Sequence, residues 1–62
     1  MKIKQYKYKN WAKVPAELTR LADLYKYLGH TIIAINYAHL PLITAKGKKA
    51  KYTEMIIVKY EV

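Results

Sequence analysis

The chain of 62 residues contains no cysteine and no serine, and it has only two glycines and two prolines. Without cysteine, neither a disulfide nor a thiolate metal site can stabilise so short a chain. A chain of this length buries only about 60% of the surface that its unfolded form exposes, so close packing and oligomerisation remain as sources of stability. The length predicts one domain, residues 1–62.

Groups that carry catalysis are equally scarce. His30 and His39 have neither a nearby carboxylate pair nor the spacing of metal ligands. With Gly29 and Gly47 as its only glycines, the chain has no glycine-rich phosphate loop. We therefore expect no enzymatic activity, no metal or other cofactor and no small-molecule substrate. The few acidic residues are scattered along the chain: Glu17, Asp23, Glu54 and Glu61.

Long apolar runs are also missing. None approaches the roughly 20 residues that span a bilayer, and the opening residues 1–4, MKIK, do not lead into the apolar core of a signal peptide. The helix expected at residues 15–28 lacks the strongly cationic face of an interfacial helix. The sequence therefore predicts a cytoplasmic protein without a membrane partner.

Acidic residues are outnumbered by 12 Lys and Arg to 4 Asp and Glu, which gives a formal net charge of +8. This balance favours a polyanionic partner: nucleic acid, an acidic protein surface or an anionic membrane. The alternative is that the charge only keeps a small, apolar-rich protein in solution. Arg20 is the only arginine, which favours contacts to phosphates over the reading of base edges by guanidinium forks.

One helix is predicted over residues 15–28. Pro15 suits the first turn, Glu17 lies near the positive end of the helix dipole, and Gly29 follows as a capping glycine. Apolar residues recur at helical spacing and form one stripe: Val14, Leu18, Leu21, Ala22, Tyr25 and Leu28.

Three strands are predicted, over residues 1–9, 30–37 and 52–60. In the first, the apolar alternation changes phase midway, which indicates either an edge strand with a bulge or a strand that uses both faces. Pro41 bends the chain and Gly47 marks a reversal, so the second and third strands form a hairpin with an extended loop.

The element order β-α-β-β predicts an α+β fold. A helical crossover brings the second strand back parallel to the first, and the hairpin places the third strand between them, in the order 1-3-2 and antiparallel throughout. The helix then covers one face of the sheet.

Both faces of this sheet carry large apolar groups. In the third strand Ile56 and Val58 point one way while Met55 and Ile57 point the other. An uncovered apolar face indicates an interface, so we expect a homodimer, formed by face packing or by pairing of sheet edges. The alternative is that residues 39–50 fold back over that face. In the second strand, strict alternation also divides the side chains between the two faces of the sheet. One face would carry Ile33, Ile35 and Tyr37, and the other Ile32 and Ala34.

This topology brings the end of the first strand and the tip of the hairpin to one end of the sheet, while Glu61 falls near the other. Bases stack on aromatic rings while ammonium groups meet phosphates, so an aromatic residue among lysines suits nucleic acid. The alternatives are that the lysines only prevent aggregation of sheet edges, and that the aromatic residues pack in the core, at a dimer contact or on the helix start. The candidate cations are Lys7, Lys9, Lys13, Lys46, Lys48, Lys49 and Lys51; the candidate aromatic contacts are Tyr6, Tyr8 and Trp11.

The stretches LYKYLGHTIIAINYA and YTEMIIVKYE carry a resemblance. They are similar to the very small sporulation-associated proteins of Bacillus and their phage-encoded relatives, over about half of the chain. The chain departs from that pattern in a longer basic insert before the last strand and in a more positive charge. The matching residues are Ile32, Ile33, Ile35, Tyr37, Tyr52, Ile56, Ile57, Tyr60 and Glu61.

The resemblance implies a β-α-β-β dimer from a phage or mobile element, with no established catalytic residues, and antagonism of host machinery such as defence systems. Together with the charge, it predicts a small non-catalytic protein in the host cytoplasm. This protein would bind nucleic acid, or a host complex that handles it, through its lysine-rich end. The alternative is an inhibitor that binds a host protein and does not touch nucleic acid.

Overall fold

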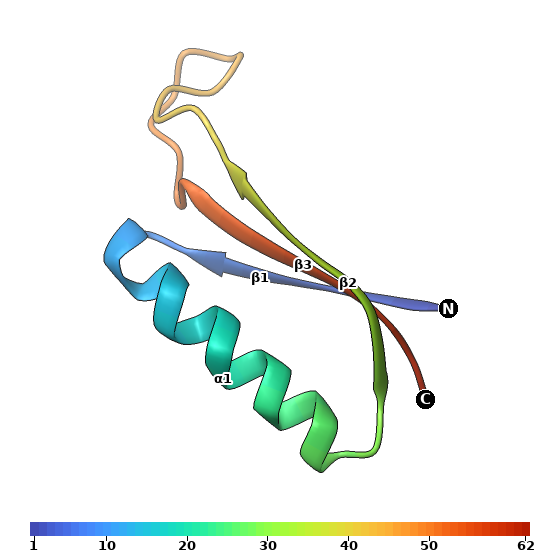
Figure 1. Ribbon diagram of the computed structural model, residues 1–62. Coiled ribbons are helices and arrows are strands. Elements are labelled where there is room, and N and C mark those ends of the chain that lie inside the picture. The colour runs from blue at the N-terminus through green and yellow to red at the C-terminus, as the bar shows by residue number, and fades with distance from the viewer.

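The computed structural model describes residues 1–62 as a three-stranded antiparallel sheet with one α-helix (Figure 1). The strand order is β1-β3-β2, and β3 pairs with both neighbours in antiparallel fashion. The predicted α+β fold and its strand order are therefore confirmed. The elements are β1 (Lys2–Tyr8), the 3₁₀ turn η1 (Trp11–Lys13), α1 (Val14–Tyr27), β2 (Thr31–His39) and β3 (Glu54–Glu61).

The irregular pairing lies in β2. Strand β1 pairs with β3 in one unbroken register and has no bulge. The change of phase in its apolar pattern therefore means that apolar side chains lie on both of its faces. In β2 the register shifts between Ile32 and Ala34, which leaves Ile33 as an extra residue. Ile32 and Ile35 therefore lie on the same face, and the strict alternation expected for this strand is wrong.

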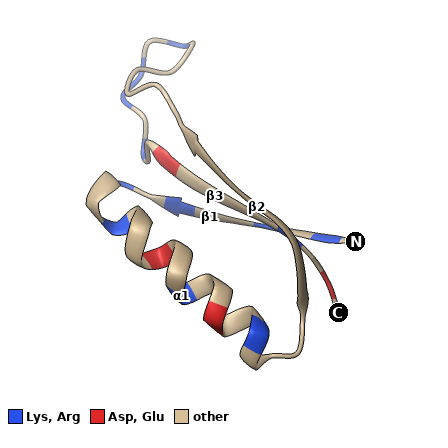
Figure 2. Ribbon diagram, in the orientation of Figure 1, with Lys and Arg blue, Asp and Glu red and all other residues tan.

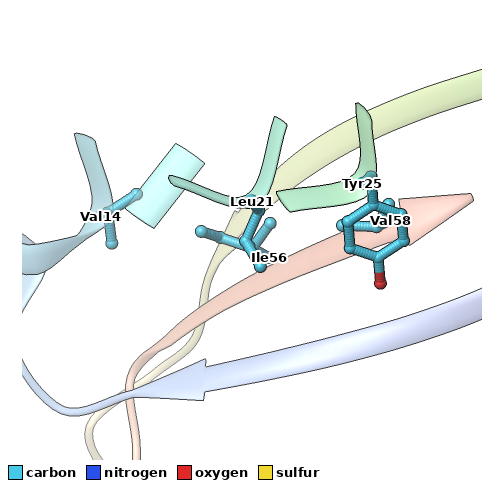
Figure 3. Close-up of a cluster of buried hydrophobic side chains, with 5 residues drawn as sticks. All are labelled: Val14, Leu21, Tyr25, Ile56 and Val58. Atoms are coloured by element: carbon cyan, nitrogen blue, oxygen red, sulfur yellow. The ribbon is translucent and has the colours of Figure 1, made fainter. Parts of the chain in front are cut away.

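Helix α1 covers one face of the sheet and forms the core against β3. Val14, Leu21 and Tyr25 project from the helix onto Ile56 and Val58 (Figure 3). These five side chains are the buried apolar residues of the chain, each at most 4% exposed. The core is thus small, as expected for a chain of this length.

The end of α1 is capped as the sequence predicts. Gly29 adopts a φ of +78°, in the left-handed region that favours glycine. The N–H of His30 donates to the carbonyl oxygen of Tyr25 over 2.9 Å, which satisfies a carbonyl in the last turn. This turn directs the chain from the helix into β2. The helix is too short and too polar to cross a membrane.

The face of the sheet opposite α1 is open. Met55 and Ile57 alternate with the buried residues of β3 and so lie on this face. Residues 40–53 do not fold back over it but project beyond the end of the sheet (Figure 1). The projection contributes to an elongated molecule of 41 × 24 × 13 Å. The alternative, that residues 39–50 fold back over this face, is therefore wrong.

Candidate functional site

Residues 40–53, called here the projecting segment, extend the β2–β3 hairpin past the sheet. At its base, the N–H of Leu40 donates to the carbonyl oxygen of Thr53 over 2.7 Å. An isolated antiparallel bridge lies nearer the tip. The chain reverses at Gly47, whose φ of +77° favours glycine. The segment is therefore a narrow, hydrogen-bonded finger.

A buried carboxylate holds both ends of this finger. Glu54, the first residue of β3, is only 1% exposed. Its carboxylate accepts hydrogen bonds from the hydroxyls of Thr53 and Tyr37, and it contacts Nδ1 of His39 at 2.9 Å. His39 ends β2 and Thr53 precedes β3. One side chain thus joins the two strands where the projecting segment leaves the sheet.

These donors stabilise the charged form of the carboxylate. The hydroxyl of Thr53, then that of Tyr37, then His39 lower the pKa of Glu54 from its ordinary 4.5 to about 2, although burial acts in the opposite direction. Conversely, the hydrogen bond to the Glu54 carboxylate raises the pKa of Tyr37. Glu54 therefore carries a negative charge at neutral pH although it is buried.

The depressed pKa of Glu54 predicts a loss of stability in acid. Because the unfolded chain binds this proton at about 4.5 and the folded chain only at about 2, the contribution is complete above 4.5 and is lost as the pH falls towards 2. We expect Glu54→Gln to be less stable at neutral pH and to lack this acid-dependent step. Urea unfolding from neutral pH down to about 2 measures both effects.

Asp23→Asn provides the control, because Asp23 is an exposed carboxyl on α1. It should retain the stability and the acid step of the unchanged chain. An unchanged acid step in Glu54→Gln would show that the carboxylate does not hold the segment as described.

Four lysines lie close together where the end of β1 meets the projecting segment. Lys9, which follows β1, lines one cleft of about 660 Å³ together with Lys49 and Lys51. The ammonium nitrogen of Lys7 lies 5.0 Å from the centre of the Tyr52 ring, within reach of a cation–π interaction. We call these four residues, Lys7, Lys9, Lys49 and Lys51, the basic end.

The backbone also joins these two parts of the chain. The N–H of Thr53 donates to the carbonyl oxygen of Tyr8 over 3.2 Å. Strand β1 and the base of the projecting segment are therefore fixed beside each other. Figure 2 shows the basic residues along the finger and at the end of β1, with the buried Glu54 at the start of β3.

Other lysines expected at the site lie outside the cleft. Lys46 and Lys48 are exposed in the turn of the projecting segment. Lys13 lies on η1, and its charge acts on Glu17 of α1. The pKa of Glu17 is lowered chiefly by hydrogen bonds from Arg20, and the charge of Lys13 adds to this effect. None of these three lysines lines the cleft.

The aromatic residues are arranged differently from the expectation. The hydroxyls of Tyr6 and Tyr25 lie 2.8 Å apart, and the Tyr8 hydroxyl donates to Glu17 over 3.0 Å. Both strand tyrosines pack against the core on the helix side of the sheet, so they are not placed to contact a ligand in the cleft. Trp11 is 64% exposed on η1 but does not line the cleft.

Sequence reasoning missed Tyr52 as a ring of the site and treated it as a strand residue. Leu42, Ala50 and Thr53 complete the lining of the cleft. The only sequence signal for Tyr52 is its position directly after Lys51 in the basic loop. Its pairing with Lys7 depends on the fold.

No family model, curated protein or solved structure matches the chain. Its fold and site define the class: a small α+β protein in which one helix covers a three-stranded antiparallel sheet and a basic cleft lies beside a projecting hairpin.

Proposed function

We propose that the chain is a non-catalytic protein that binds nucleic acid, or a host complex that handles it, through the basic end. The supporting observation is the cleft that Lys9, Lys49 and Lys51 line together. Their positive fields add, and flexible ammonium groups suit the phosphates of a polyanion without reading its sequence. The resemblance to phage-encoded proteins adds a setting, the cytoplasm of an infected host cell.

Fluorescence anisotropy of labelled single-stranded DNA, duplex DNA and RNA tests this function. We expect binding at low salt that weakens steeply as salt rises, because each neutralised phosphate releases counterions. For the four ammonium groups of the basic end, the slope of log K against log salt should be about −3. No binding to any of the three at low salt would contradict the proposal.

The alternative function is inhibition of a host protein that has an acidic surface. It is favoured by Leu42 and Ile43, which are each 56% exposed on the projecting segment, since exposed apolar side chains beside polar ones are typical of protein–protein contacts. A pull-down from host lysate with and without nuclease separates the two functions. A partner retained after nuclease treatment, together with no oligonucleotide binding, would support the inhibitor.

We further propose that two copies associate. Ile3 and Ile33 are 57% and 51% exposed, and the sheet face opposite α1 has no cover. The β2 edge offers a second route, because its nine residues include no Lys, Arg, Asp or Glu, whereas β1 carries lysines that oppose edge pairing. Light scattering should return the mass of two chains at micromolar concentration. The mass of a single chain would contradict the dimer.

A further inference from the structure

Two hollows flank the stretch of chain that contains Tyr52. The larger is the basic cleft of about 660 Å³, within the ~300–1,000 Å³ range of small-molecule sites. The smaller, of about 350 Å³, is lined by Leu40, Pro41 and Ala45. Ala50, Lys51 and Tyr52 belong to both linings. The hollows are therefore neighbours that share one wall.

The two hollows differ in chemistry. The larger has three ammonium groups and suits phosphate. The smaller has mainly apolar walls and a single lysine, Lys51, which suits the flat face of a base. Lys7 lies over the ring of Tyr52 at 5.0 Å, which helps to fix the ring between the hollows. A phosphate site and a base site that share one wall match the phosphate and the base of a nucleotide.

We propose that the two hollows bind one phosphate and one base of a single strand, with the phosphate in the larger hollow and the base in the smaller, stacked on Tyr52. This inference rests on the proposed function and deepens it by naming the form of the nucleic acid. In a duplex the bases are paired and stacked inside the helix, so they cannot enter the hollows, and only the phosphates reach the lysines. In a single strand each base can turn out and stack on a ring.

The test compares labelled oligothymidine with a duplex of equal phosphate number at one salt concentration. We expect the unchanged chain to bind the single strand about tenfold more tightly. Tyr52→Leu should bind the single strand about tenfold more weakly than the unchanged chain does. The slope of log K against log salt should stay the same, since no ammonium is removed. Tyr52→Phe keeps the ring and should keep the preference. Thermal melts of both variants check that they are folded.

Tyr27→Leu is the matched control, because Tyr27 is 87% exposed at the far end of α1. It should bind as the unchanged chain does. A further arm uses inorganic polyphosphate, which has the charge but no bases. We expect it to displace oligothymidine about tenfold less effectively per phosphate.

Equal affinity for duplex and single strand, or full binding by folded Tyr52→Leu, would overturn the stacking site while leaving nucleic-acid binding by the basic end intact. Polyphosphate as effective as oligothymidine would overturn it in the same way. No binding to any nucleic acid would remove both proposals.

Discussion

Replacement of Lys9, Lys49 and Lys51 by glutamine should lower the affinity for single-stranded nucleic acid by about a hundredfold or more at low salt. Each ammonium lost removes a charge-assisted contact with a phosphate. The slope of log K against log salt should become shallower by about 2. All three side chains line an open cleft, so the free energy of unfolding should change by less than about 0.5 kcal/mol. Anisotropy titrations and urea unfolding measure the two effects.

The matched control replaces Lys2, Lys4 and Lys26, which are exposed elsewhere on the molecule. Both variants remove three positive charges from the same formal net charge of +8. If general attraction were the whole cause of binding, both would weaken it equally. A loss confined to the cleft variant shows that the arrangement of the lysines is what matters. Equal losses would contradict a defined site.

Leu21→Ala should bring the chain close to the limit of its stability. Leu21 is fully buried between α1 and the sheet, and removal of such a side chain costs about 2–5 kcal/mol. A chain of this size has roughly 3–9 kcal/mol of total stability. We therefore expect a fall of at least about 10 °C in the melting temperature, measured by circular dichroism.

Leu28→Ala is the control, because Leu28 is 53% exposed at the end of the helix. This substitution should lower the free energy of unfolding by about 1 kcal/mol or less. Similar losses in the two variants, or a Leu21→Ala melt equal to that of the unchanged chain, would contradict the small central core.

Much of the fold could be predicted because local signals agree with each other. Pro15 and Gly29 bracket the helix, and its bounds in the structure, Val14–Tyr27, differ from those expected by one residue at each end. The strand order follows from the crossover rule once the hairpin is recognised. The bulge at Ile33 could not be predicted, because an extra residue in a run of apolar side chains leaves no trace in the pattern.

The site was harder to predict because it depends on long-range contacts. The proximity of the first strand to the hairpin tip follows from the topology, which correctly brings Lys9 beside Lys49. The roles of Tyr6 and Tyr8 depend on which face of β1 meets the helix, and the phase change of that strand left this open. Glu54 lies two residues before Ile56 and four before Val58, so alternation along the strand places it on the same buried face. Its three hydrogen-bond partners appear only in the structure.

We propose that the end of β1 and the projecting segment form one surface for one anionic ligand. Titration of the ¹⁵N-labelled chain with oligothymidine, followed by amide chemical shifts, tests it most directly. We expect the amide signals of Lys7, Lys9 and residues 49–53 to shift together along one saturating curve. The amide signals of Gly29 and Glu61, at the opposite end of the molecule, should not change. Shifts limited to one of the two segments, or centred on the opposite end, would contradict it.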